Sequence, residues 1–140
     1  MMRCVMLAVA LLVTAVGCGG ASSASSPTDA VRSFNSAVAD GDGARACDLL
    51  DGAARKELQD STQGAIRGSC RQVIEALAAF YDDATKDRLR DAEVQSQPDG
   101  DRATATFASA VTPGHRESYS LRRTGGSWRI ASLGIGTAGP

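Results

Sequence analysis

The spacing of apolar residues changes once along this chain, close to Asp91. Before that point apolar side chains recur every three or four residues, which is typical of one face of a helix. After it they recur at every second residue, which is typical of a strand with one buried face. Helices followed by an antiparallel meander predict an α+β fold, with N-terminal helices packed on one face of a sheet of about four strands.

The helical part contains several start signals. Ser26-Pro27 is one, because serine caps helices and proline fits the first helical position. Asp42 can cap a second, short helix, and a third is expected over residues 53–58. The strongest helix is expected from about residue 69 to residue 82, continued over residues 84–90. Its apolar face is predicted to carry Cys70, Val73, Ile74, Leu77, Phe80 and Tyr81.

The strand part is divided by turn residues. Val94 lies in a short first strand that ends at the predicted turn Gln97-Pro98-Asp99-Gly100. Further turns are expected at Pro113-Gly114 and Gly125-Gly126. The other strands are expected over residues 102–110, 117–123 and 127–134.

Alternation assigns one face of these strands to the core. The inward residues are predicted to be Ala103, Ala105, Phe107, Tyr119, Leu121, Trp128 and Ile130. Leu133 falls on the opposite parity from Ile130. This predicts a bulge near Ala131, or a strand end there.

The first eighteen residues, MMRCVMLAVALLVTAVGC, indicate where the protein is located. Arg3 provides a positive start, an apolar run follows, and small residues precede Cys18, as in a secretory signal peptide. The run is shorter than the roughly 20 residues that cross a bilayer as a helix. We therefore interpret residues 1–17 as a cleaved signal peptide.

The segment Ala15-Val16-Gly17-Cys18 resembles the lipobox of bacterial lipoproteins. The resemblance implies that Cys18 takes a diacylglyceryl group and becomes the mature N-terminus. Such a group suffices to anchor the protein in the cell membrane, on its extracytoplasmic face. Residues 18–26 then form a flexible tether, and residues 27–137 a single domain. The alternative is an ordinary cleaved signal with an incidental cysteine.

Removal of this leader leaves an even pair of cysteines. Cys4 leaves with the signal peptide and Cys18 takes the lipid, so Cys47 and Cys70 remain, in an oxidising compartment. We predict a disulfide between them, with two buried free thiols as the alternative. The net charge of −1 and the predicted export both argue against nucleic acid as a partner.

Several segments are similar to secreted bacterial lipoproteins of the nuclear transport factor 2-like superfamily. They are Ala37-Val38-Ala39-Asp40-Gly41-Asp42, Ala46-Cys47-Asp48-Leu49-Leu50, Ala53-Ala54-Arg55 and the closing Gly126-Ser127-Trp128-Arg129-Ile130. The resemblance implies a cone, in which a curved sheet wraps a long helix and leaves a pocket. The aromatic residues expected to line this pocket are Phe34, Tyr81, Phe107, Tyr119 and Trp128.

Catalytic members of the superfamily place a carboxylate or histidine inside the cone. None of the inward residues named above is a general base near neutral pH. Tyr119 can donate a hydrogen bond, and Tyr81 or Asp82 can reach the mouth of the cone. His115, the only histidine, is expected to be exposed in its turn. With both thiols paired, no metal site or cofactor is predicted.

The last hairpin is basic. Its arginines are Arg116, Arg122, Arg123 and Arg129. They form either a solvated face or a surface for anionic lipid or cell-wall polymer.

Two functional hypotheses follow. The first is a lipid-anchored, non-catalytic binding or accessory domain at the cell envelope, with an apolar small molecule or an envelope protein as partner. The second is a small isomerase or hydratase that acts on an apolar substrate. A buried ionisable group in the pocket distinguishes the second from the first.

Overall fold

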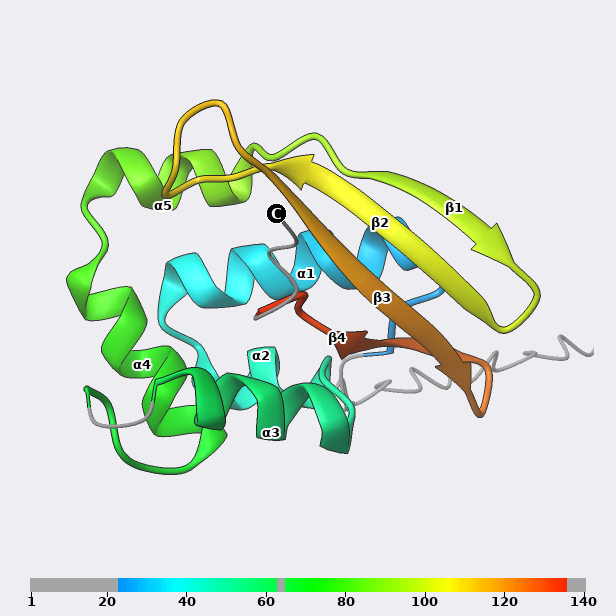
Figure 1. Ribbon diagram of the computed structural model, residues 1–140, viewed down its shortest axis with the longest axis horizontal. Coiled ribbons are helices and arrows are strands. Elements are labelled where there is room, and N and C mark those ends of the chain that lie inside the picture. Colours follow the sequence, from blue (N-terminus) through cyan, green and yellow to red (C-terminus); the bar gives the residue numbers. More distant parts are fainter. Residues whose placement is uncertain (1–22, 63–64, 136–140) are drawn as a thin grey trace, which may run out of the picture.

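The computed structural model describes residues 23–62 and 65–135. Within them lie the helices α1 (Pro27–Asp40), α2 (Gly43–Asp48), α3 (Gly52–Ser61), α4 (Cys70–Phe80) and α5 (Asp83–Arg90), and then the strands β1 (Gln95–Asp99), β2 (Arg102–Ala108), β3 (Arg116–Thr124) and β4 (Ser127–Ser132) (Figure 1). The strands form one antiparallel sheet in the order β1-β2-β3-β4. The α+β prediction is confirmed. The predicted signal peptide and Cys18 lie outside the described residues.

The helices begin where capping residues allow them to. Ser26, Asp42, Asp51 and Asp82 each accept a hydrogen bond from a backbone N–H in the first turn that follows, and Ser69 forms a capping box with Gln72. The predicted starts at Ser26 and Asp42 are therefore confirmed. The predicted continuation of α4 is wrong, because the backbone of Tyr81 is extended and Asp82 caps α5 as a separate helix.

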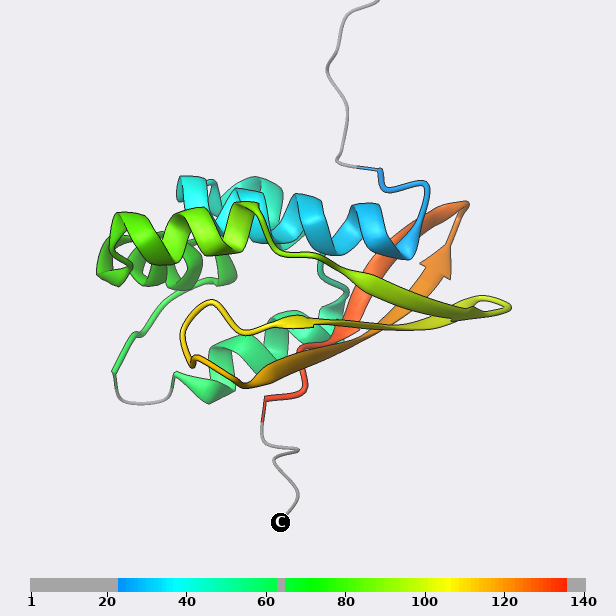
Figure 2. The ribbon, with the colours of Figure 1, turned by 90° about the horizontal axis from the view of Figure 1, so that it is seen from above.

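The core lies between the helices and the inner face of the sheet. Helix α1 packs against β2 and β4, and also against α2, α4 and α5. In Figure 2 the β1–β2 hairpin extends beyond the helices. The alternation predicted for the strands is confirmed, since Ala103, Ala105, Phe107, Leu121, Trp128 and Ile130 are buried.

The predicted bulge is present in β4. Ser120 pairs with Ser132, whereas its neighbour Leu121 pairs with Ile130, which leaves Ala131 as the extra residue. A single extra residue reverses the side-chain parity of a strand. Leu133 is therefore buried like Ile130, although the two are an odd number of positions apart.

The cone itself does not form, because the sheet is not strongly curled. Strong curvature is introduced by repeated bulges and by glycines within strands. The four strands contain no glycine, and their one register shift is the bulge at Ala131. The helices instead cover an open, twisted sheet.

Three local predictions are corrected. The first turn of the sheet lies at Gly100 and Asp101, because β1 is an edge strand, where Pro98 is tolerated. Phe80 is 79% exposed, because α4 ends there and the chain turns toward α5. The tether was expected to run to residue 26, but Ala24 is buried and accepts a hydrogen bond from the Trp128 N–H (3.0 Å).

Candidate functional site

A cavity of about 200 Å³ lies between the helices and the inner face of the sheet. Its apolar wall includes Val38, Leu58, Ile74, Leu77, Leu89 and Leu133. Val111 and Ile135 also line it and are 60% and 44% exposed, so they mark its mouth. The space is comparable with apolar cavities of about 150 Å³ that hold benzene.

Aromatic side chains form one side of the cavity. The Tyr119 ring meets the rings of Phe107 and Phe34 edge-on, at centroid distances of 4.9 and 6.0 Å. Tyr81 lines the cavity as well, so four of the five aromatic residues that were expected in its wall lie there. Trp128 is not part of its lining. It pairs across the sheet with Arg123, whose guanidinium lies 5.6 Å from the Trp128 ring centroid.

Asn35 brings an unpaired amide into this apolar wall. The residue is 1% exposed and lines the cavity from α1. Neither its side-chain nitrogen nor its side-chain oxygen has a hydrogen-bond partner among the described residues. Such a buried amide costs about 1–3 kcal/mol, and native proteins rarely retain one without a reason.

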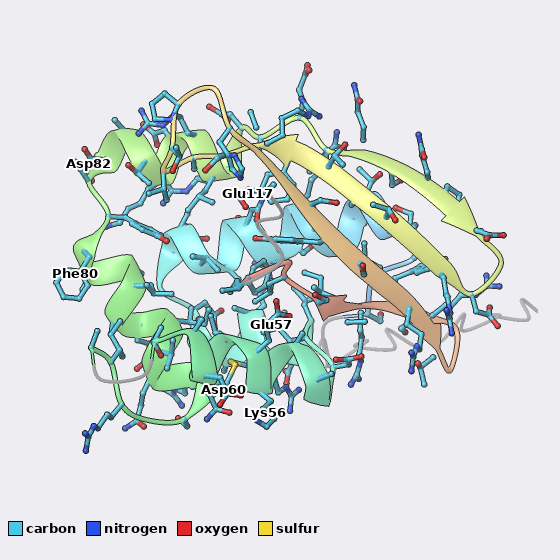
Figure 3. All side chains as sticks on the ribbon, viewed as in Figure 1. Lys56, Glu57, Asp60, Phe80, Asp82 and Glu117 are labelled. Atoms are coloured by element: carbon cyan, nitrogen blue, oxygen red, sulfur yellow. A yellow bond between two sulfur atoms is a disulfide. The ribbon has the colours of Figure 1, made fainter. Side chains whose placement is uncertain are left out.

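Glu117 brings a carboxylate to the same cavity. It lies on β3 opposite Phe107, is partly buried, and has the inward parity of Tyr119 and Leu121. In Figure 3 Glu117 lies over α1, near the end of β3 that is closer to α5. Glu117 is therefore an ionisable residue on the inner face that the list of predicted inward residues did not include. The alternation places Glu117 on the inner face, but the residue was omitted because it is charged.

Asn35 was missed because it is polar. It follows Val31 by four residues and precedes Val38 by three, which is the spacing of the buried face of α1. A search for apolar residues at helical spacing passes over a polar residue at such a position.

The two tyrosines in the cavity wall remain protonated well into the alkaline range. Burial raises the pKa of Tyr119 above its ordinary value, and the nearby carboxylate of Glu117 raises it further. The same two causes raise the pKa of Tyr81. Both phenols are therefore hydrogen-bond donors at neutral pH.

Asp82 does not belong to the site. Its carboxylate accepts a hydrogen bond from the Thr85 backbone N–H (2.7 Å) as the cap of α5. Hydrogen bonding from Thr85 lowers the pKa of Asp82, which makes its carboxylate a weaker base. Figure 3 shows Asp82 and Phe80 at the junction of α4 and α5, away from Glu117. His115 is exposed, as predicted.

The loop on one side of the mouth is fixed by hydrogen bonds. The Ser109 hydroxyl accepts from the N–H groups of Val111 and Thr112. Arg88 of α5 donates from Nε to the Ala110 carbonyl (2.9 Å). These contacts hold Val111 beside the cavity.

The other side of the mouth is fixed by Glu57 of α3. Its carboxylate accepts from the backbone N–H groups of Leu133 (2.9 Å) and Ile135 (2.6 Å). The segment after β4 is thereby held against the helices, and it supplies two residues of the lining. Figure 3 shows Glu57 between α3 and this segment.

The Cys47–Cys70 disulfide is present, as predicted, and joins α2 to the first residue of α4. Across residues 23–62 and 65–135 there is no cluster of three or more His, Cys, Asp or Glu side chains that could hold a metal ion. None of the helices in these ranges combines the length and the apolarity needed to cross a membrane.

Comparisons with protein-family models, with curated proteins and with solved structures found no match to this chain.

Proposed function

We propose that this chain is a lipid-anchored protein of the extracytoplasmic face of the cell membrane, and that its domain binds a small, mostly apolar molecule in the cavity. The proposal includes kinship with the nuclear transport factor 2-like superfamily, with an open sheet in place of the cone. It assigns no catalytic step to the domain.

The anchoring part is supported by the leader and by the disulfide. Residues 1–18 have the layout of a signal peptide that ends in a lipobox-like cysteine. The Cys47–Cys70 bridge fits an oxidising compartment.

The observation that carries the binding part is the unpaired amide of Asn35. A ligand that both donates and accepts a hydrogen bond would satisfy its two side-chain polar atoms and offset their burial. The rest of such a ligand would be apolar, because the cavity wall is largely aliphatic and aromatic. Ligand pockets usually measure about 300–1,000 Å³, so a cavity near 200 Å³ favours a molecule about the size of one substituted ring.

The anchor is tested with Cys18→Ala in cells. The variant is expected to be released from the membrane fraction or to remain unprocessed. Recovery of the variant in the membrane fraction at mature size would show that Cys18 is not the anchor.

Binding is tested with benzamide and toluene as probes, which share a ring but differ in the carboxamide. Benzamide is expected to raise the melting temperature of the protein more than toluene does, and Asn35→Leu is expected to abolish this preference. Asn35→Leu removes a buried unpaired amide, so it should fold at least as stably as the parent. Equal effects of both probes on the parent would contradict the assignment of Asn35.

A second candidate function is favoured by Glu117. A carboxylate that can accept a proton lies on the same inner face as a neutral phenol, Tyr119, that can donate a hydrogen bond. This pair suits a small isomerase or hydratase acting on an apolar substrate. A screen with small epoxide and enol substrates, alongside a ketosteroid that exceeds the cavity, tests it. Turnover that is lost in Glu117→Gln and retained in Asp82→Asn would favour the enzyme.

A further inference from the structure

Three arginines form a row across the outer face of the sheet. Arg102 of β2 is in register with Arg122 of β3, and Arg122 is in register with Arg129 of β4. All three side chains are exposed, and none forms an ion pair within the described part of the chain. Asp99 of β1 is in register with Arg102, at the β1 end of the row.

Such a row is unfavourable for the sheet by itself. Like charges directly opposite each other on neighbouring strands destabilise the pairing. The neighbouring Arg123, which has the opposite parity from Arg122, is not part of the row and is paired with Asp101 (2.9 Å). The repulsion within the arginine row indicates a role other than stabilising the fold.

The chain enters the domain beside this row. Ala24 pairs with Trp128, the neighbour of Arg129, and the turns β1–β2 and β3–β4 lie at the same end of the sheet (Figure 1). Six Cα–Cα steps separate Ala24 from Cys18, so the two are at most about 22 Å apart. A lipid on Cys18 would therefore keep Ala24 within about 22 Å of the membrane surface, and the arginine row close to that distance.

We propose that the arginine row of Arg102, Arg122 and Arg129 docks on the anionic lipid headgroups of the membrane that holds the anchor. The proposal rests on the anchoring at Cys18 proposed above. The three arginines give this face a local positive charge that complements the anionic headgroups, although the whole chain has a net charge of −1. The short tether raises the effective concentration of the headgroups, so that a weak electrostatic contact becomes populated.

This orientation places the ligand cavity away from the bilayer contact. The cavity is on the inner face of the sheet, whereas the arginine row is on the outer face. A ligand can then reach the mouth at Val111 and Ile135 while the row is docked.

The docking is tested on the lipidated full protein reconstituted in vesicles of phosphatidylcholine, with or without phosphatidylglycerol. Trp128 is the only tryptophan and is adjacent to Arg129, so energy transfer from Trp128 to a dansyl-labelled lipid headgroup reports docking. Transfer is expected to rise with phosphatidylglycerol and to fall as salt is added. Each arginine near an anionic surface contributes about a fivefold factor, so the row shifts the docked-to-free ratio by on the order of a hundredfold.

The decisive variant is Arg102→Gln with Arg122→Gln and Arg129→Gln. It is expected to show the transfer seen on phosphatidylcholine alone, and its melting temperature should be unchanged or higher, because the repulsion is removed. The matched control changes the exposed Arg32, Arg45 and Arg67, which lie outside the sheet, to Gln. This control has the same net charge as the row variant and is expected to dock as the parent does.

Equal energy transfer for the parent and the row variant on phosphatidylglycerol vesicles would overturn the docking. A loss of transfer in the control variant as large as that in the row variant would overturn it too. Soluble polyphosphate that binds the parent through the row, with no rise in transfer on phosphatidylglycerol, would assign the row to a soluble polymer instead. Mass spectrometry of the N-terminal peptide separates the two proposals. A Cys18 without lipid overturns the anchor, whereas a lipidated chain with no difference between variants overturns the row alone.

Discussion

Glu117 and Tyr119 lie two positions apart on β3 and face the same side of the sheet, where both line the cavity. The negative charge of Glu117 opposes ionisation of the Tyr119 phenol, and burial opposes it more strongly. The phenol therefore titrates above its ordinary pKa of 10.0 in the folded protein. This relationship gives a pH dependence of stability that can be measured.

We expect stability to fall as the pH rises above about 10, the ordinary pKa of tyrosine. In that range the unfolded chain releases the Tyr119 proton while the folded chain keeps it, so unfolding is favoured by up to about 1.4 kcal/mol per pH unit. Below the ordinary pKa both states hold the proton, and this dependence is absent. Tyr119→Phe should reduce the slope measured by urea unfolding, and Tyr81→Phe should reduce it too. An identical slope in Tyr119→Phe would contradict the assignment.

The contribution of the carboxylate is measured with Glu117→Gln. Removing its charge is expected to lower the pKa of Tyr119 in the folded protein, but not to the ordinary value, because burial remains. Ultraviolet absorbance of the phenolate checks this in the Tyr81→Phe background, where Tyr119 is the only tyrosine. Glu93→Gln, an exposed site just before β1, is the control and should leave the titration unchanged.

Gly43 is predicted to be intolerant of a side chain. A Cβ at this first residue of α2 would lie 2.5 Å from the Arg71 carbonyl oxygen, next to the half-cystine that starts α4. Gly43→Ala should therefore destabilise by about 1–3 kcal/mol through overpacking. Gly52→Ala is the matched control, because Gly52 is the first residue of α3 and a Cβ there meets no atom within 4 Å. It should be neutral or stabilise by up to about 1 kcal/mol. Urea midpoints that do not separate the two variants would refute the steric argument.

The sequence determines much of this fold through local rules. Caps at Ser26 and Asp42 and the alternation in the strands follow from hydrogen bonding and burial of single segments. The bulge at Ala131 follows from parity, because Leu133 and Ile130 cannot otherwise share a face. The curl of the sheet does not follow, since it depends on how strands twist against the helices and not on apolar spacing.

The site was less predictable than the fold. Its aromatic residues follow the apolar pattern, but its polar residues do not. Asn35 and Glu117 occupy inward positions of a helix and a strand, where a search for apolar residues disregards them. Phe80 is the opposite case, because it has the helical spacing of the buried face but lies where α4 ends. A polar residue at a position that the apolar pattern assigns to the buried face is therefore the sequence signal for a site of this kind.

The disulfide is expected to be a large part of the stability. Cys47 and Cys70 are 23 positions apart, and a bridge over such a loop stabilises by about 3 kcal/mol in the chain-entropy model. Reduction should lower the urea midpoint of the parent by a corresponding amount. The double variant Cys47→Ala with Cys70→Ala should unfold at the reduced midpoint whether or not reductant is present. The bridge would be dispensable if the reduced parent kept the urea midpoint of the oxidised parent. Alkylation of both thiols after unfolding would confirm that the bridge had been reduced.

Glu57 is expected to hold the cavity wall closed. Its carboxylate is the acceptor for the N–H groups of Leu133 and Ile135, and both residues line the cavity. Glu57→Ala leaves these donors unpaired and should destabilise by about 1–3 kcal/mol, with faster hydrogen exchange at the two amides. Glu57→Gln keeps one carbonyl acceptor and should fall between Glu57→Ala and the parent. The control is Lys56→Ala on the same helix, since its ion pair with Asp60 is exposed and such pairs contribute at most about 1 kcal/mol. Unchanged exchange at Leu133 and Ile135 in Glu57→Ala would mean that the sheet alone positions this segment.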